Sequence, residues 1–138
     1  MKIIIGVPAF NEEKNIGSLI VNLKKKYDHV LVCDDGSSDT TANIASEMGA
    51  IVVKHSKNQG YGSAIKTIFN ESKKIDCDIL ITFDADGQHQ ISEIDDILKP
   101  IMNNTADIVI GSRFLGKTKN LPKYRKFGIK TITGLTNI

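Results

Sequence analysis

The chain has 138 residues, a length that suits one domain and is too short for two ordinary ones. Apolar residues make up 41% and charged residues 25%, close to the globular average, which argues against a disordered or fibrous chain. The formal net charge of +2 is too small for a general nucleic-acid binder, so no nucleic-acid partner is expected.

The charge is distributed unevenly along the chain. Residues 1–112 carry 11 basic and all 16 acidic side chains, whereas residues 113–138 carry 7 basic and no acidic ones. We therefore expect residues 1–112 to form the core of the domain. Residues 113–138 are predicted to be a basic, partly amphipathic segment of the same domain that meets an anionic partner.

Cysteine content and hydropathy indicate the cellular compartment in which the protein is located. Cys33 and Cys77 are too few for a disulfide scaffold, and their spacing is not that of metal ligands. The apolar run at the N-terminus is too short for a signal-peptide core, and no run reaches the roughly 20 residues of a membrane span. These features predict a cytoplasmic protein with free thiols.

Short apolar runs rich in β-branched residues alternate with helical patterns along the chain. Most of the runs lack polar alternation, which is typical of strands covered by helices on both faces. We therefore predict an α/β fold with a mostly parallel sheet. The predicted strands are Ile3–Val7, Val30–Cys33, Ile51–Val53, Ile79–Phe83 and Ile108–Ile110.

Helical patterns occupy the intervals. Asp39 is expected to cap the second helix, Gly49 to end it, and Pro100 to kink or shorten the fourth. The first helix has an apolar stripe formed by Ile16, Leu19, Ile20 and Leu23. The predicted helices are Asn15–Lys26, Thr40–Met48, Ser63–Ser72 and Ser92–Met102.

Polar clusters follow all five predicted strands. Because ligands of open α/β sheets bind at the carboxyl ends of the strands, this convergence predicts a binding site there. The clusters are residues 8–13, 34–40, 58–64, 84–89 and 111–113.

The first three clusters each have a simple structural interpretation as well. The 8–13 cluster lacks the glycine pattern of a dinucleotide-binding fold, which disfavours NAD or FAD, and a turn with helix-capping acids explains it. The 34–40 cluster fits a base or ribose site and equally a capped turn, and a phosphoacceptor receiver domain also places acids there. The 58–64 cluster is a glycine-rich entry to a helix, which suits a ligand close to the backbone, but it lacks the lysine of a P-loop, which favours a tight turn.

The sharpest signal is the sequence Asp84-Ala85-Asp86-Gly87-Gln88-His89, directly after an apolar strand. Two carboxylates one residue apart offer hard oxygen ligands for Mg²⁺ or Mn²⁺, and a diphosphate would supply further oxygens. Such a metal neutralises charge on a leaving diphosphate. A surface acidic turn is the alternative, and His89 is expected to be a hydrogen-bonding neighbour rather than a ligand.

Taken together and in this order, the five motifs resemble family 2 glycosyltransferases. The greatest similarity is to the branch of dolichyl-phosphate mannose synthases and polyprenyl-phosphate glycosyltransferases. The resemblance implies a GT-A fold, which is a Rossmann-like three-layer α/β/α sandwich. It also implies a GDP- or UDP-linked sugar donor and a divalent cation, Mn²⁺ or Mg²⁺, at the Asp-x-Asp motif.

The resemblance assigns roles by position. It implies that Asp86 and Gln88 hold the metal together with Asp84, and that Asp86 and Arg113 are the catalytic residues. Phe10 stands where the family more often has tyrosine, so a phenol hydrogen bond is lost while stacking is kept. The implied donor-binding residues are Pro8, Phe10, Glu12, Cys33, Asp34, Asp35, Asp84, Ala85 and Arg113.

Residues 121–128 also resemble that branch, where a basic amphipathic helix lies at the membrane surface beside a lipid acceptor. Lys123, Arg125 and Lys126 are then expected to attract the acceptor phosphate and anionic headgroups, at the cytoplasmic face of the membrane. A packed helix is the alternative. The chain ends before a further acidic motif that family members carry, and a second copy is one way to cover the sheet edge this leaves.

The resulting hypothesis is an inverting, metal-dependent transfer of a hexose from GDP-mannose or a UDP-sugar to a polyprenyl (dolichyl) phosphate. A sugar hydroxyl as acceptor would need a carboxylate base from the part of the family pattern that this chain lacks. The alternatives are a non-catalytic nucleotide-sugar-binding fragment and, less well supported, a receiver-like signalling domain.

Overall fold

The computed structural model describes residues 1–87 and 89–111. Residues 1–94 form one compact unit, and the described residues from Asp95 onward belong to a second. In the first unit strands and helices alternate as predicted. The strands are β1 (Ile3–Ala9), β2 (His29–Asp34), β3 (Ile51–Lys54) and β4 (Ile79–Thr82), and the helices α1 (Ile16–Lys24), α2 (Thr41–Glu47) and α3 (Tyr61–Lys74).

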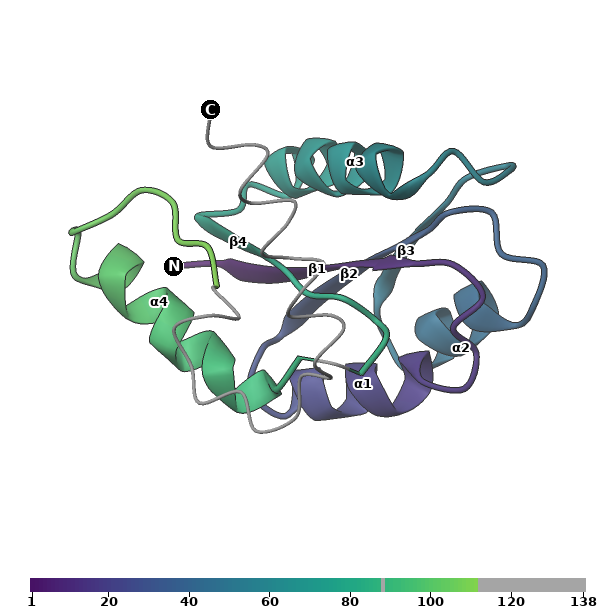
Figure 1. Cartoon of the computed structure of the whole chain (residues 1–138), viewed down its shortest axis with the longest axis horizontal. Helices are drawn as coiled ribbons and strands as arrows, with labels where there is room; N and C mark the ends of the chain where they lie inside the picture. Colours follow the sequence, from purple (N-terminus) through teal and green to yellow (C-terminus); the bar gives the residue numbers. More distant parts are fainter. Residues whose placement is uncertain (88, 112–138) are drawn as a thin grey trace, which may run out of the picture. The chain divides into compact units, whose positions relative to one another are not determined.

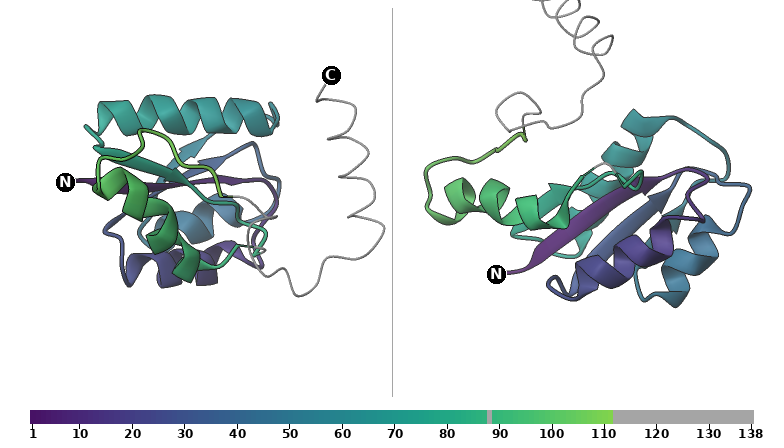
Figure 2. Two further views of the ribbon diagram at one scale, coloured as in Figure 1. Left: turned by 60° about the vertical axis from the view of Figure 1, so that its left-hand side comes forward. Right: turned by 60° about the horizontal axis from the view of Figure 1, so that its bottom comes forward.

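The four strands form one parallel sheet in the order β3-β2-β1-β4. Helix α3 covers one face of the sheet, and α1 and α2 cover the other (Figures 1 and 2). The predicted three-layer α/β/α architecture is therefore confirmed. The strand order also rules out a receiver-type fold, in which the first strand lies between the second and the third.

Burial on both faces explains why the strands lack polar alternation. Ile4 of β1 and Leu31 of β2 are fully buried against Ile68 of α3. On the other side of the sheet, the stripe predicted for α1 contributes the fully buried Ile16, Ile20 and Leu23.

One glycine sets how closely α3 approaches the sheet. A Cβ atom at Gly6 of β1 would lie 2.3 Å from Cγ2 of Ile68. Only glycine at this position leaves room for the Ile68 side chain against the strand. The helix layer above β1 therefore depends on Gly6.

Strand β1 runs two residues further than predicted, through Pro8. Its pairing with β4 ends at Gly6 opposite Thr82, and the Phe83 N–H donates to the Gly6 oxygen at 2.9 Å. Beyond that point β1 pairs with β2 alone, up to Ala9 opposite Asp34. Pro8 thus lies where the ladder to β4 has already ended, so its missing N–H costs no hydrogen bond on that side.

The fourth predicted helix begins as a single 3₁₀ turn, Ile91–Glu93, and continues as α4 (Ile94–Met102). Pro100 lies inside α4, which ends two residues later. No helix among residues 1–87 and 89–111 is long and apolar enough to cross a membrane. The boundary predicted after residue 112 falls at the edge of the described residues and stays a prediction.

The prediction of a fifth strand is wrong. Residues 108–110 are not in a strand, and Ile108 and Ile110 are 80% and 85% exposed. A short β-branched run forms a strand only with a hydrogen-bonded neighbour. Within the described part of the chain, β4 pairs with β1 alone.

We predict that Gly36→Ala destabilises the protein by about 2 kcal/mol, because Gly36 has a φ of +74°. An added Cβ would also lie 2.4 Å from the Lys57 carbonyl carbon. Urea denaturation measures the change. Gly62→Ala is the matched control, because Gly62 lies in α3 with open space around it and alanine there favours the helix by up to about 1 kcal/mol. Equal stabilities for the two variants would contradict this account.

Candidate active site

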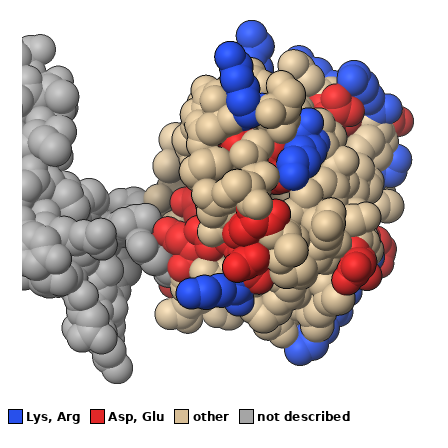
Figure 3. Space-filling model, turned by 90° about the vertical axis from the view of Figure 1, so that its right-hand side faces the viewer, with Lys and Arg blue, Asp and Glu red and all other residues tan. Residues whose placement is uncertain are grey.

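A cavity of about 450 Å³ lies at the carboxyl ends of the strands. In the sheet, β1 has β2 on one side and β4 on the other, so the strand order reverses direction at β1. The cavity therefore lies at the topological switch point, where open α/β sheets bind ligands. On the face where the strands end, acidic side chains gather near the centre (Figure 3). The cavity is lined by Pro8, Ala9, Phe10, Glu12, Asp35, Asn58, Gly60, Tyr61, Ala64, Asp84, Ala85 and Asp86.

The structure brings most of the predicted site residues that it describes to this one cavity. Cys33 and Asp34 are fully buried and are not among its lining residues. Gln88, Arg113, Lys123, Arg125 and Lys126 lie outside the described residues. The predicted residues that line the cavity are Pro8, Phe10, Glu12, Asp35, Asp84, Ala85 and Asp86.

The loops that follow β1 and β2 are joined by hydrogen bonds. The Ser37 hydroxyl accepts from the Asn11 N–H at 2.9 Å, and the Asn11 side-chain oxygen accepts from the Ser38 N–H at 3.0 Å. The buried Thr41 hydroxyl accepts from the Glu12 N–H at 2.8 Å. These polar residues hold the end of β1 in place, and Phe10 and Glu12 thereby face the cavity.

Asp39 reinforces the same junction. It accepts hydrogen bonds from the Thr41 hydroxyl and N–H and from the Glu13 N–H. Burial acts to raise the pKa of Asp39, but these hydrogen bonds outweigh it and the pKa is lowered. The N-cap of α2 is Thr40, one residue later than predicted, and Asp39 instead accepts from the N–H of Thr41, the first residue of the helix.

The adjacent carboxylates Asp34 and Asp35 have different surroundings. Asp34 closes the turn: its Oδ1 accepts from the Ser37 N–H at 3.0 Å, and its Oδ2 lies 3.4 Å from Lys54 Nζ. Asp35 lines the cavity instead. The sequence left a turn and a ligand site as alternatives for this cluster, and the fold assigns the turn to Asp34 and the cavity wall to Asp35.

Asp35 is held by three donors from residues 55–60: His55, which directly follows β3, and Gln59 and Gly60 of the loop beyond it. His55 Nδ1 lies 2.7 Å from Oδ1, the Gln59 N–H donates to Oδ1 at 2.9 Å, and the Gly60 N–H donates to Oδ2 at 2.8 Å. Burial acts to raise the pKa of Asp35, but hydrogen bonds from Gln59, His55 and Gly60 outweigh it and lower the pKa. Asp35 is therefore a carboxylate at neutral pH, and it retains acceptor capacity toward the cavity.

Cys33, His55 and Asp35 form an arrangement like that of a cysteine hydrolase. Cys33 Sγ lies 3.6 Å from His55 Nε2, and His55 Nδ1 contacts Asp35. Burial, with the negative charge of Asp35, raises the pKa of the Cys33 thiol to about 11. The thiol is also fully buried, so it remains protonated and out of reach of a substrate.

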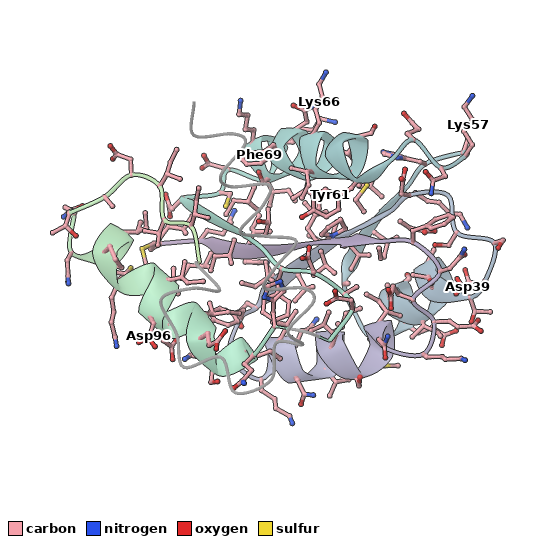
Figure 4. The ribbon with its side chains drawn as sticks, in the orientation of Figure 1. Asp39, Lys57, Tyr61, Lys66, Phe69 and Asp96 are labelled. Carbon is pink, nitrogen blue, oxygen red and sulfur yellow. The ribbon has the colours of Figure 1, made fainter. Side chains whose placement is uncertain are left out.

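Asp84 is bound on both sides by protein groups. The Tyr61 hydroxyl donates to Oδ1 at 3.1 Å, and His89 Nε2 lies 3.2 Å from Oδ2. Tyr61 lies on the side of α3 that faces the sheet, whereas Lys66 of the same helix points away (Figure 4). Burial and the contact with Asp84 raise the pKa of Tyr61, which keeps its hydroxyl a donor. His89 is thus the hydrogen-bonding neighbour that the sequence predicted.

The residues at this edge suit a cation that is shared with a substrate. Asp84 and Asp86 line the cavity, and carboxylate oxygens are the ligands that Mg²⁺ and Mn²⁺ prefer. Among residues 1–87 and 89–111, no group of three or more His, Cys, Asp or Glu side chains is placed to hold a metal ion. A cation here would therefore take its remaining oxygens from a bound diphosphate and water.

Sequence reasoning missed two residues of this site. Tyr61 was missed because it lies in the glycine-rich segment 58–64, which was interpreted as a tight turn. His55 was missed because it belongs to no motif: no second functional residue stands near it in the sequence at a characteristic spacing. Its position at the carboxyl end of β3 is the only indication that the sequence offered.

Comparison with known proteins agrees with the geometry. The model of glycosyl transferase family 2 matches residues 4–136. A UDP-N-acetylglucosamine–dolichyl-phosphate N-acetylglucosaminyltransferase of Methanococcus voltae is 35% identical over 88% of this chain and 57% of its own length. A polyprenol monophosphomannose synthase of Mycolicibacterium smegmatis is 30% identical over 91% of this chain and 51% of its own length.

Solved structures show the same fold. Glucosyl-3-phosphoglycerate synthase of Mycobacterium tuberculosis, solved with Mn²⁺ and UDP, superposes with a TM-score of 0.60 and 26% identity. The superposition covers 72% of this chain and 39% of that protein. The chain belongs to glycosyl transferase family 2 and has the predicted GT-A fold. It spans about half the length of the curated relatives described above.

We predict a specific acid sensitivity from the lowered pKa of Asp35. A carboxyl group whose pKa is lower in the folded state stabilises the protein above its unfolded pKa of about 3.9, and this contribution is lost as the pH falls through the folded pKa. The unfolding free energy should therefore fall below about pH 4 more steeply in the wild type than in Asp35→Asn. Urea denaturation between about pH 3 and pH 6 measures both slopes, and parallel slopes would contradict the assignment.

We also predict that the two thiols differ in reactivity. Cys33 should resist alkylation by iodoacetamide at pH 8 in the folded protein, because the thiol is fully buried and its pKa is about 11. Cys77 is only partly buried and should react first. Mass spectrometry of peptides measures both, and unfolding in urea should equalise them. Faster labelling of Cys33 would show that the loops around it open.

Proposed function

We propose that this chain binds the nucleotide-sugar donor in an inverting transfer of a hexose to a polyprenyl phosphate. The observation that carries the proposal is the cavity at the switch point, which combines the exposed ring of Phe10, the buried carboxylate of Asp35 and the Asp-x-Asp motif. The names of the relatives, which include dolichyl-phosphate and polyprenol-phosphate transferases, support this acceptor class.

The end of β1 and the loop after β2 suit a nucleobase. Phe10 lines the cavity and is 45% exposed, so its ring is available for stacking. Asp35 is a carboxylate that only accepts hydrogen bonds, so it pairs with a base that presents a ring N–H and is repelled by an unprotonated ring nitrogen. Uracil and guanine carry such an N–H, whereas the matching ring nitrogens of cytosine and adenine are acceptors. GDP- and UDP-linked donors are therefore favoured over CDP- and ADP-linked ones.

The end of β4 suits the diphosphate. Asp84 and Asp86 would hold a divalent cation there, and that cation would neutralise charge on the leaving nucleoside diphosphate. The Mycobacterium tuberculosis neighbour was solved with Mn²⁺ and UDP and also with Mg²⁺ and UDP, which supports both the metal class and the ligand class. Tyr61 and His89 orient Asp84 for this role.

The chemistry that we propose is a direct displacement. An oxygen of the acceptor phosphate attacks the anomeric carbon as the bond to the donor's β-phosphate oxygen breaks, and the electron pair leaves with the nucleoside diphosphate. A phosphate with a second pKa of about 6 is largely ionised near neutral pH, so no protein base is needed. Arg113 and the basic residues Lys123, Arg125 and Lys126 are proposed to face the donor and acceptor phosphates, at the cytoplasmic surface of the membrane.

A non-catalytic donor-binding module is the second candidate. It requires only the cavity at the carboxyl ends of the strands, which all lies in residues 1–87. Both candidates predict nucleotide binding, and they differ in turnover. Release of nucleoside diphosphate from GDP-mannose or a UDP-sugar, measured with and without polyprenyl phosphate, separates them.

We predict that the chain binds UDP or GDP in the presence of Mn²⁺ and loses at least about tenfold in affinity in EDTA. Asp86→Ala should remove this metal dependence, because it deletes a carboxylate at the diphosphate end of the cavity. Isothermal titration calorimetry of the folded chain with each nucleotide measures both effects.

Asp96→Ala is the matched control for Asp86→Ala. Asp96 is an exposed aspartate of α4 that pairs with Lys99 at 2.6 Å and does not line the cavity (Figure 4). Its substitution should leave nucleotide affinity unchanged. Wild-type metal-dependent affinity in Asp86→Ala would contradict the metal assignment, and no binding of either nucleotide by the wild type would contradict the donor site.

A further inference from the structure

His55 is a buried histidine that contacts the cavity only through another residue. Its side chain is 9% exposed, and it is not among the residues that line the cavity. Its own N–H donates to the Asp34 oxygen at 2.9 Å, which extends the ladder between β2 and β3 by one residue. The backbone of His55 is thus fixed by the sheet.

Both ring nitrogens of His55 have partners inside the protein. Nδ1 lies 2.7 Å from Asp35 Oδ1, and Nε2 lies 2.9 Å from Thr67 Oγ1 of α3. Because a carboxylate can only accept, Nδ1 must carry the proton in this contact. In the neutral ring Nε2 is then the acceptor, and the Thr67 hydroxyl donates to it. The ring is oriented from both ends.

The cavity-lining carboxylate depends on this ring. Asp35 Oδ1 faces His55 and the Gln59 N–H, while Oδ2 accepts from the Gly60 N–H and retains capacity for one more donor. The Gln59 and Gly60 donors belong to a loop, whereas His55 is fixed by the sheet and by Thr67. His55 is therefore the rigid member of the set.

We propose that His55 is a positioning residue that keeps the Asp35 carboxylate turned toward the cavity to accept the ring N–H of the donor's nucleobase. This inference rests on the proposed function, because it assumes that Asp35 contacts the base. His55 itself touches neither the donor nor the acceptor. The Asp35 carboxylate sets the tautomer that makes His55 a donor, and Thr67, from the helix that covers this face of the sheet, holds the ring from its other end by donating to Nε2.

A double-mutant cycle on nucleotide affinity tests the proposal. His55→Leu should weaken binding of the preferred nucleotide, UDP or GDP, by about tenfold, as expected for a lost hydrogen bond to a charged group. His55→Asn should bind close to wild type, because its amide nitrogen occupies the place of Nδ1 and restores the donor. Thr67→Val should weaken binding less than His55→Leu does.

Coupling through Asp35 distinguishes positioning from general destabilisation. The double variant Asp35→Asn/His55→Leu should bind no more weakly than Asp35→Asn alone, because His55 acts only through that carboxylate. Additive losses, or no rescue by His55→Asn, would overturn the proposal. If Asp35→Asn itself leaves affinity unchanged, the assignment of Asp35 to the base fails, and that outcome counts against the proposed function as well. If Asp35→Asn weakens binding and His55→Leu does not, only the positioning role fails.

The wild-type chain provides a test that does not depend on how the variants fold. A long-range ¹H–¹⁵N spectrum, recorded where the ring is uncharged, should show His55 with its proton on Nδ1 and an unprotonated Nε2. Addition of the nucleotide should shift the His55 signals without changing the tautomer. A proton on Nε2 would overturn the proposal, because Nδ1 could then donate nothing to Asp35.

Discussion

The hydrogen bonds of Asp35 fasten the loop after β3 to the end of β2, and the cavity depends on this attachment. Two backbone N–H groups and one imidazole converge on the carboxylate. Gly60 comes directly before α3, so the bond from its N–H also fixes where that helix begins. Gly36 lets the two loops approach to contact distance. Without these contacts, Asn58 and Tyr61 would have no fixed place in the cavity wall.

The remaining polar residues at this edge have mainly structural roles. Ser37 and Thr41 accept backbone hydrogen bonds from the loop after β1, and Asp34 closes its own turn. The groups with distinct chemistry that line the cavity are few: the ring of Phe10, the buried carboxylate of Asp35, and Asp84 and Asp86 after β4. The site is thus preorganised by neighbours that never reach the ligand, which reduces the ordering required on binding.

The predictions that succeeded rest on local patterns. The apolar stripe of α1 and the continuous strand runs follow from the burial that a three-layer sandwich imposes, so periodicity was enough to place them. The prediction of a fifth strand failed because a strand forms only beside a hydrogen-bonded neighbouring strand, and a short apolar run does not specify that neighbour. His55 and Tyr61 were missed because their partners, Asp35 and Asp84, are 20 and 23 residues away in sequence.

The α/β class, the family and the edge of the sheet where the site lies can all be predicted from the amino-acid sequence, because they follow from hydrophobic patterning and from motifs that recur in order. Which of two adjacent aspartates faces the cavity and which closes a turn depends on contacts that form in the folded chain. Asp34 and Asp35 have the same chemistry and neighbouring positions. Their roles separate only when the loop after β3 brings its donors to one of them, and long-range contacts of that kind leave no local trace in the chain.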